Sequence, residues 1–421
     1  MYFDFTEEQL MLRRMTRELL GREAAPQVVR RLMEQPEGYS AATWRQLADL
    51  GLLGVTIAEA FGGQGLGVVE QALVLEEMGR AALPSPYFAS AVLAATALEA
   101  SGDETLQRRY LPGIASGEMK ATLALWEDNA AWGPEAIRLA ARRERDHFIL
   151  DGTKRLVPYA QIADLLIVAA QTGHTGAEAN GRGVHGNGSS DGSTGNAADH
   201  KASGITLFAV ERGTPGVEVR PLGTMDLTTR IAEVQWREVA VDQSQVIGAV
   251  GGGWPILEAV LEHAAVGASA EMLGAARKCL EMSVEYAKSR EQFGQPIGTF
   301  QAIKHKCAEM LLEVEQSHAA TYYAAWALSA GAPDASIAAS VAKAFVTGAA
   351  RKVCGEAIQV HGGIGYTWEF DLHLYFKRAK HLEPLYGDAD FHRERALVLT
   401  LAQMADGGQR TVVEERREAA L

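Results

Sequence analysis

The spacing of apolar residues changes twice along the chain. From about residue 6 to 118, apolar side chains recur every three or four positions, which is the spacing of one helix face. The middle of the chain instead alternates polar and apolar residues in short runs bounded by Gly, Pro, Asp and Asn, a pattern typical of strands. The pattern therefore predicts an α+β fold that is mainly α. We expect an N-terminal helical domain (1–120), a middle antiparallel, barrel-like β domain (121–249) and a C-terminal four-helix bundle (250–421).

End signals delimit individual helices. Thr6, followed by two glutamates, predicts a helix start, because a threonine side chain can cap the first free N–H groups of a helix. In the C-terminal part, one long amphipathic pattern runs from Gly251 to Phe293. Two further long helices are predicted at about 300–330 and 335–361, with alanine-rich faces suited to close packing.

One segment of the middle domain has almost nothing to bury. Residues 173–204 are rich in Gly, Ser, Asn and Asp, so burial cannot offset the entropy lost on ordering them, and we expect a flexible Gly-rich insertion. Its histidines, His174, His185 and His200, are irregularly spaced and have no cysteine beside them. We therefore predict no metal site here.

Composition and charge narrow the class of protein. Lys and Arg number 40 and Asp and Glu number 53, so the net charge is −13, which argues against a nucleic-acid partner. Cys279, Cys307 and Cys354 show no paired spacing and are expected to be buried thiols in a reducing, cytoplasmic setting. The first residues carry acids rather than an unbroken apolar run, so we predict neither a signal peptide nor a membrane span.

Two short segments carry groups suited to an anionic or flat ligand. Arg290 and Phe293 stand where a long helix ends; a guanidinium can fork onto a phosphate, and an aromatic ring can lie against a flat ring system. "QVHGGIGYT", beginning at Gln359, places two glycines after a helix, where backbone N–H groups can approach a pyrophosphate. Each segment alone is more often an ordinary helix end.

Together with the helix, strand, helix order, these motifs resemble the acyl-CoA dehydrogenase family over nearly the whole chain. The similarity rests on "RxxFG" with "FQ" downstream and on "QVHGGIGYT" followed by a glutamate. It also rests on "FTEEQ", "LGLLGVTIAEAFGGQGLG" and "YLPGIASGEM". The resemblance implies FAD as cofactor, an acyl-CoA substrate, an electron-transfer flavoprotein as redox partner, and either a homotetramer or a hetero-oligomer with a related chain.

The implied reaction is α,β-dehydrogenation of an acyl-CoA thioester, in which a base removes the α proton and the β hydride passes to FAD. Because that proton is only weakly acidic, the base should be a carboxylate in a dry pocket. By resemblance, one set of residues holds the FAD of a neighbouring subunit. The set comprises Arg290, Phe293, Gln301, Gln359, Val360, His361, Gly362 and Gly363.

The half of the flavin pocket that the chain itself should supply departs from the family pattern. Trp126 stands where the family has a threonine, although Glu127 beside it is kept. Leu156 and Pro158 replace a Trp and a Thr that normally face the flavin. Proline has no N–H to donate, and Trp is far bulkier than Thr, so the sequence leaves open whether this half binds FAD.

The usual catalytic glutamate falls at Tyr386, and a phenol with an ordinary pKa of ~10 is a poor base. Asp388 is the first substitute predicted, and Glu383 also flanks the tyrosine. Some family members place the glutamate on the long helix, at the position of Ala264 here, so Glu262 is the alternative.

Two hypotheses follow. In the first, the chain is a working dehydrogenase. In the second, it is a non-catalytic partner subunit that completes the FAD site of a related catalytic chain, which would explain why the donated residues are kept and the receiving residues altered.

Overall fold

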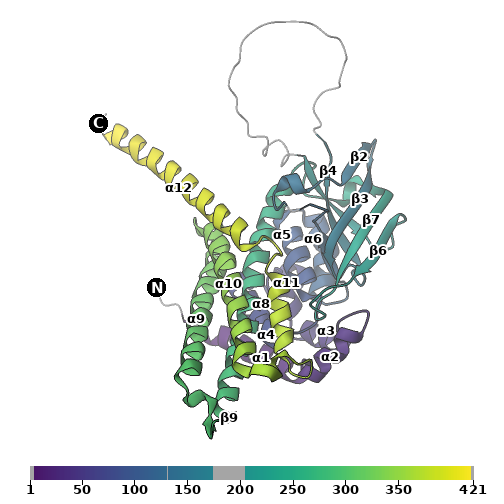
Figure 1. Cartoon of the computed structure of the whole chain (residues 1–421). Coiled ribbons are helices and arrows are strands. Elements are labelled where there is room, and N and C mark those ends of the chain that lie inside the picture. Colours follow the sequence, from purple (N-terminus) through teal and green to yellow (C-terminus); the bar gives the residue numbers. More distant parts are fainter. Residues whose placement is uncertain (1–3, 130, 174–203, 419–421) are drawn as a thin grey trace.

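The computed structural model describes residues 4–129, 131–173 and 204–418, and it divides into helical, β and helical parts along the sequence (Figure 1). The mainly helical fold with a central sheet confirms the predicted fold class. The predicted Gly-rich insertion, with His174, His185 and His200, lies outside the described residues apart from its two end positions. Within the described ranges, no helix is long and apolar enough to cross a bilayer.

The N-terminal part is built from helices that pack around apolar side chains. Thr6 caps α1 as predicted: its side chain accepts a hydrogen bond from the Gln9 N–H, and the Gln9 side chain accepts one from the Thr6 N–H. The helices are α1 (Glu7–Glu23), α2 (Pro26–Glu34), α3 (Ala41–Asp49), α4 (Val68–Ala81), the π-helical η3 (Phe88–Ala94) continuing into α5 (Ala95–Ala100), and α6 (Glu104–Ala115).

The middle part is an eight-stranded sheet in the described residues, in the order β6-β7-β3-β2-β4-β5-β8 with β1 paired to β4. Most pairs are antiparallel, as predicted, but β1 and β2 both pair with β4 in parallel. The parallel pairs arise because the β2–β3 hairpin intervenes between β1 and β4 and carries the chain back. The strands are β1 (Ala121–Ala124), β2 (Ala140–Glu144), β3 (His147–Pro158), β4 (Leu165–Gln171), β5 (Ile205–Glu211), β6 (Val217–Leu222), β7 (Ile231–Asp242) and β8 (Val246–Ile247).

The C-terminal part contains long helices that pack against one another and against α4. The two helices predicted at about 300–330 and 335–361 are confirmed within a few residues. The elements are α8 (Gly253–Ser289), the short hairpin β9 (Glu291–Gln292) and β10 (Gln295–Pro296), α9 (Gln301–Ser329), α10 (Ala335–His361), η7 (Gly362–Tyr366), α11 (Leu372–Leu382) and α12 (Ala389–Glu418). Figure 1 shows α12 extending away from the other helices.

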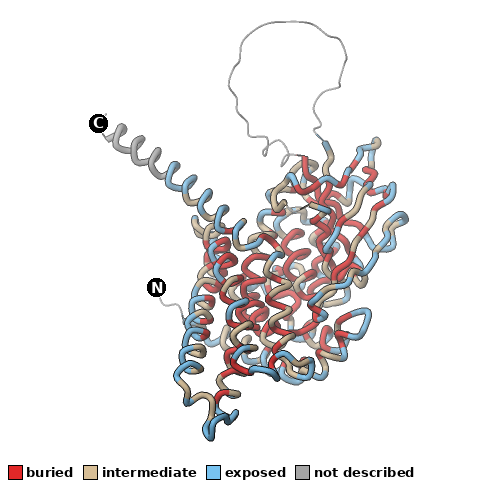
Figure 2. The backbone as a smooth tube through the Cα atoms, in the orientation of Figure 1, coloured by how far each residue is buried: buried red, intermediate tan, exposed pale blue. Residues whose placement is uncertain are grey.

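Two glycines bring α4 and α8 into close contact. A Cβ atom on Gly79 would lie 2.0 Å from the Glu271 carbonyl oxygen, and one on Gly274 would lie 1.9 Å from the Glu76 carbonyl oxygen. Any larger residue would force the two helices apart. The buried residues concentrate along these helix contacts and through the sheet (Figure 2). The close crossing fixes the spacing between the N-terminal helices and the bundle, where the candidate site lies.

Arg378 on α11 joins all three parts in the interior. Its guanidinium donates hydrogen bonds to the Asp226 carboxylate at 2.9 Å and to the Glu271 carboxylate at 3.2 Å. It also donates to the carbonyl oxygens of Leu83 at 3.2 Å and Thr228 at 3.1 Å. The arginine is 4% exposed, so these contacts are shielded from water.

Candidate functional site

A cavity of about 590 Å³ opens between the segment after β1, the start of α8 and the start of α12. A cavity of this size falls within the range of small-molecule sites. Its aromatic lining comes from Trp126, Trp132, Trp254, Tyr386 and Phe391. Its charged lining comes from Glu258, Glu262, Glu394 and Arg395. We call this space the outer cavity.

Glu262 is the partly buried carboxylate of the outer cavity. It accepts a hydrogen bond from Arg395 Nη2 at 2.7 Å, and its side chain is 15% exposed. Arg395 is itself held by the Ser340 hydroxyl at 2.9 Å, so the guanidinium fixes where the carboxylate points. Glu258 lies one helical turn earlier and lines the same cavity, but it is exposed. Sequence reasoning missed Glu258, although its i, i+4 spacing from Glu262 on a predicted helix was the available signal.

Tyr386 occupies the position where the resemblance places the base. It is 9% exposed and stacks on Phe88, with ring centroids 5.2 Å apart and an interplanar angle of 15°. Burial, with a smaller contribution from the Glu271 charge, raises the pKa of its phenol well above the ordinary value. The tyrosine therefore keeps its proton at neutral pH and does not act as a base. Sequence reasoning did not single out Phe88, which lies far from Tyr386 along the chain.

The turn that carries Tyr386 is tightly constrained. Tyr386 has φ of 61°, a left-handed value that is uncommon for a residue with a large side chain. The ring Nε2 of His392 lies 2.9 Å from the Tyr386 carbonyl oxygen. Lys343, buried on α10, donates to the carbonyl oxygens of Leu382, Glu383 and Gly387 at 3.1, 3.0 and 3.1 Å. These contacts hold the turn in place, and His392 itself lines the outer cavity.

We expect Lys343→Met to destabilise the protein by about 2–3 kcal/mol at pH 7, because three carbonyl groups, which are buried or partly buried, lose their donor. Burial lowers the pKa of Lys343 to about 7, below the ordinary 10.5. Between those values the unfolded chain binds more protons, so the lysine's contribution to stability grows as pH rises from 7 toward 10. Denaturant unfolding at both ends of that range measures the difference. Lys352→Met, an exposed lysine on the same helix paired with Glu313, is the control and should change stability by less than about 0.5 kcal/mol. A loss that does not grow with pH would contradict the expectation.

Of the positions considered for the base, Asp388, Glu383 and Ala264 do not line the outer cavity. Asp388 is exposed, and its carboxylate accepts a hydrogen bond from the Phe391 N–H at 2.9 Å, which caps the start of α12. Glu383 pairs with Arg351 at 3.0 Å and with Lys380. Neither residue lines the outer cavity. Ala264, the other family position, is fully buried and carries no group for chemistry.

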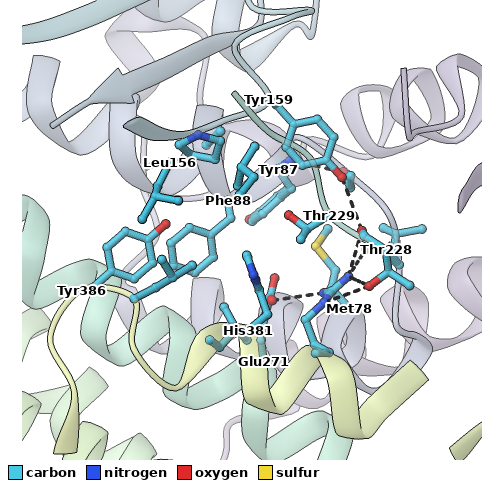
Figure 3. A pocket seen from close by; sticks show the side chains of 18 residues that line it. Met78, Tyr87, Phe88, Leu156, Tyr159, Thr228, Thr229, Glu271, His381 and Tyr386 are labelled. Carbon is cyan, nitrogen blue, oxygen red and sulfur yellow. Dashed lines mark hydrogen bonds and ion pairs between the residues drawn. The ribbon is translucent and has the colours of Figure 1, made fainter. Parts of the chain in front are cut away.

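A second, much smaller cavity of about 50 Å³ lies beside the Phe88–Tyr386 pair, which forms part of its lining (Figure 3). Tyr386 lines both cavities. Tyr87, Glu271 and His381 contribute polar groups to the smaller space, which we call the inner cavity. Figure 3 shows Tyr386 and Phe88 side by side at one edge, with Glu271 and His381 rising from the helices below.

The segment that contains Trp126 and Glu127, which is expected to face a flavin, has a structural role as well. Glu127 accepts a hydrogen bond from the buried Lys154 ammonium at 2.6 Å and others from the N–H groups of Arg138 and Leu139. Its carboxylate therefore ties the segment after β1 to the strand β3 and to the residues before β2. Trp126 packs edge to face against Trp132, with centroids 5.0 Å apart and an angle of 88°, and both rings line the outer cavity.

Leu156 and Pro158, on the β3 strand, line the inner cavity and not the outer one. Leu156 has φ of 55° and is 41% exposed. Pro158 lies near the same space, and its carbonyl oxygen accepts a hydrogen bond from the Thr122 hydroxyl at 2.6 Å. Neither side chain offers a hydrogen-bond donor, so any polar contact to a ligand here would come from the backbone.

The residues predicted to hold a neighbour's FAD gather at the opposite end of the bundle. Tyr286 on α8 stacks on His361 at the end of α10, with centroids 4.3 Å apart, which brings the ends of both helices together. Phe293 is 92% exposed, and Arg290 is exposed beside it. Gln301 is exposed as well and lies 2.9 Å from the His305 ring through its amide nitrogen.

The glycine segment divides into an outer and an inner part. Gln359, Gly362 and Gly363 are exposed, and no atom lies within 4 Å of where a Cβ would stand on either glycine. Backbone there is open to close approach by a ligand. Val360 and His361 are 4% exposed, so their side chains face the interior rather than that surface.

The comparisons with known proteins decide the family. The family described as acyl-CoA dehydrogenase, N-terminal domain, matches residues 6–118, and the acyl-CoA dehydrogenase C-terminal domain matches residues 251–410. The chain belongs to the acyl-CoA dehydrogenase family. It is similar to acyl-CoA dehydrogenase IpdE2 of Mycobacterium tuberculosis, with 32% identity over 89% of this chain and 91% of the relative.

Solved structures of this family agree with the fold. Butyryl-CoA dehydrogenase from Megasphaera elsdenii superposes with a TM-score of 0.83 at 27% identity, covering 95% of this chain and 100% of that one. A chain of the ChsE4–ChsE5 complex from Mycobacterium tuberculosis gives a TM-score of 0.80 at 28% identity, covering 94% and 97%. The protein is thus an oxidoreductase of acyl-CoA dehydrogenase type. No group of three or more His, Cys, Asp or Glu side chains in the described part of this acyl-CoA dehydrogenase is arranged to hold a metal ion.

Proposed function

We propose that the protein catalyses FAD-dependent α,β-dehydrogenation of an acyl-CoA thioester. The observation that carries the proposal is the outer cavity, in which the Glu262 carboxylate faces a space walled by aromatic rings. A carboxylate in such a space is the group that α-proton abstraction requires. FAD, when bound, accepts the hydride, which no protein side chain can do.

We assign Glu262 as the base in preference to Asp388. Glu262 lines the outer cavity beside Tyr386, whereas Asp388 is committed to capping α12 on the surface. Arg395 orients the Glu262 carboxylate through a hydrogen bond of 2.7 Å from its Nη2. The aromatic rings give the space beside the carboxylate an apolar wall against which an acyl chain can pack.

FAD of a neighbouring subunit would be held at the other end of the bundle. Arg290 supplies a cation for the pyrophosphate, and the exposed Phe293 ring supplies a flat apolar surface. Gln359 with the open glycines 362 and 363 lets a phosphate approach the backbone. These residues fit the cofactor because they are exposed and gathered at one end of α8 and α10, and an exposed aromatic ring of this kind is otherwise costly.

The same arrangement implies assembly, because residues that bind a neighbour's cofactor need a neighbour. Large apolar side chains are exposed on the outer helices of the bundle, as an oligomer interface requires. These are Leu311 and Leu312 on α9, Val341 and Phe345 on α10, and Leu397, Val398, Leu401 and Met404 on α12. We propose a homotetramer in the cytoplasm that acts in lipid metabolism and passes electrons to an electron-transfer flavoprotein.

A second candidate is a non-catalytic subunit that completes the FAD site of a related chain. Tyr386 at the base position and the Trp126–Trp132 pair support it, and one similar solved structure is titled as a complex of two named chains, ChsE4 and ChsE5. The comparisons as a whole favour the dehydrogenase.

The visible spectrum of the purified chain separates the two. We expect a bound flavin band that bleaches when acyl-CoA is added without oxygen. A colourless chain that acquires flavin only when co-expressed with a related chain would reject the self-sufficient enzyme and support the partner subunit. Arg290→Ala is the internal check, and it should reduce the flavin content of the oligomer while the unfolding temperature of the flavin-free protein stays the same as that of flavin-free wild type.

A further inference from the structure

The inner cavity holds a buried hydroxyl group that lacks a partner. Tyr87 lines this cavity and is 1% exposed, yet its hydroxyl makes no hydrogen bond to any described residue. Leaving a buried donor unpaired costs about 1–3 kcal/mol, so a fold retains such a group when something else pairs with it. The cavity that Tyr87 lines is where we expect that partner to sit.

An acceptor faces the same space. Glu271 is 7% exposed, and one of its carboxylate oxygens takes a hydrogen bond from Arg378 Nη1 at 3.2 Å. Burial raises the pKa of the Tyr87 phenol, and the Glu271 charge raises it further, which places the two groups in one electrostatic environment. His381 also lines the cavity and points toward it in Figure 3. The inner cavity is therefore lined by a hydrogen-bond donor, the Tyr87 hydroxyl, and an acceptor, the Glu271 carboxylate, which are both buried from solvent.

The charges of Arg378, Asp226 and Glu271 determine whether the inner cavity favours a neutral or a charged ligand group. Arg378 is the cation between two buried carboxylates, those of Asp226 and Glu271. Arg378 also lines the inner cavity, but its single positive charge is shared by the two carboxylates, so an entering carboxylate or phosphate would add a further negative charge in a low dielectric. A neutral hydroxyl can accept from Tyr87 and donate to Glu271 at once.

The positions and volumes of the two cavities decide which part of a ligand could occupy the inner one. Tyr386 lines both cavities and stacks on Phe88, which lines the inner one, so a ligand that spans the two cavities has to pass this pair. A volume of 50 Å³ is several times the ~10–15 Å³ that one water needs, which suits a few heavy atoms rather than a long chain.

We propose that the inner cavity is a subsite for a hydroxyl group at the far end of the substrate's acyl chain. This inference rests on the proposed function, because it assumes that an acyl-CoA occupies the outer cavity. It assigns Tyr87 and Glu271 as residues that determine substrate specificity.

The test compares matched thioesters on the purified flavin-loaded protein. The probes are a short series of ω-hydroxyacyl-CoA thioesters, each beside the alkanoyl-CoA in which a methyl group replaces the hydroxyl, and dissociation constants are measured by calorimetry. We expect the best-fitting hydroxyl compound to bind roughly tenfold more tightly than its methyl counterpart. The dicarboxylic counterpart, ending in a carboxylate, should bind more weakly than either.

Tyr87→Phe should remove the preference for the hydroxyl while leaving alkanoyl-CoA affinity unchanged. The variant loses an unpaired buried oxygen, so its unfolding temperature should stay level or rise. Tyr110→Phe is the matched control, because the Tyr110 hydroxyl is also buried without a described partner but lines neither cavity.

Each outcome of these measurements either supports or overturns the proposed subsite. Equal affinity for the hydroxyl and methyl compounds, or a preference that survives Tyr87→Phe, would mean that ordered water alone pairs with Tyr87 and would overturn the subsite. If alkanoyl-CoA and hydroxyacyl-CoA both fail to bind the wild type, the proposed function fails first and the subsite falls with it.

Discussion

Replacing Arg378 with methionine should destabilise the protein by at least about 3–5 kcal/mol, the usual cost of leaving a buried charge without its partner. Asp226 and Glu271 would then be two buried carboxylates with no cation between them. The carbonyl groups of Leu83 and Thr228 would lose a donor as well. Denaturant unfolding monitored by tryptophan fluorescence and by circular dichroism measures the loss.

The pH dependence of that loss identifies its cause. Without the guanidinium, burial holds the pKa values of both carboxyl groups above those in the unfolded chain, so the folded variant binds more protons. Stability then falls as pH rises through that window, and the difference from wild type should be smaller near pH 5 than near pH 8. In the wild type, burial acts to raise the pKa of Asp226. The Arg378 charge outweighs burial and holds that pKa below its ordinary value.

Two further variants test the same point. Arg351→Met removes an arginine that is 56% exposed and paired with Glu383, and it should cost no more than about 1 kcal/mol. Adding Asp226→Asn and Glu271→Gln to Arg378→Met should recover part of the lost stability, because the buried charges are then gone. If the triple variant is as unstable as the single one, packing of the arginine rather than its charge holds the three parts together.

The sequence predicted what local spacing encodes. The Thr6 cap depends on Gln9, three residues away, and the helices over 301–329 and 335–361 follow from a continuous apolar stripe with breaks at each end. The parallel pairing of β1 and β2 with β4 was not predicted, because strand register depends on contacts between distant segments and leaves no local signal.

At the candidate site, too, the sequence predicts local features but not contacts between distant segments. Tyr386 could be placed by motif, but its stacking on Phe88 joins residues about three hundred positions apart along the chain and is visible only in the fold. Asp388 was favoured because it lies two residues from Tyr386, yet sequence proximity does not fix direction, and its carboxylate turns back to cap α12. The buried pairing of Glu271 with Arg378 likewise has no sequence signature, since nothing near Glu271 marks it as charged and enclosed.

Glu262→Gln should lower turnover of acyl-CoA by roughly 10²–10⁴-fold, the usual contribution of a positioned general base. Glutamine keeps the size of the side chain and an acceptor for Arg395 Nη2, but it cannot take the α proton. Flavin content and acyl-CoA affinity should stay close to wild type, so the loss falls on kcat rather than on KM. Solvent deuterium exchange at the α carbon of a bound thioester isolates proton removal from hydride transfer, and it should slow by a similar factor.

Asp388→Asn and Glu258→Gln complete the experiment because they remove the neighbouring carboxylates one at a time. Asp388→Asn keeps an N-cap side chain for α12 and should retain nearly full turnover. Glu258→Gln alters an exposed residue of the same cavity and should change the rate by only a fewfold, through the local charge. If Asp388→Asn abolished exchange while Glu262→Gln did not, the turn after α11 would have to move its carboxylate inward in the working oligomer. The Glu262–Arg395 pair would then be a structural contact of α8 and α12.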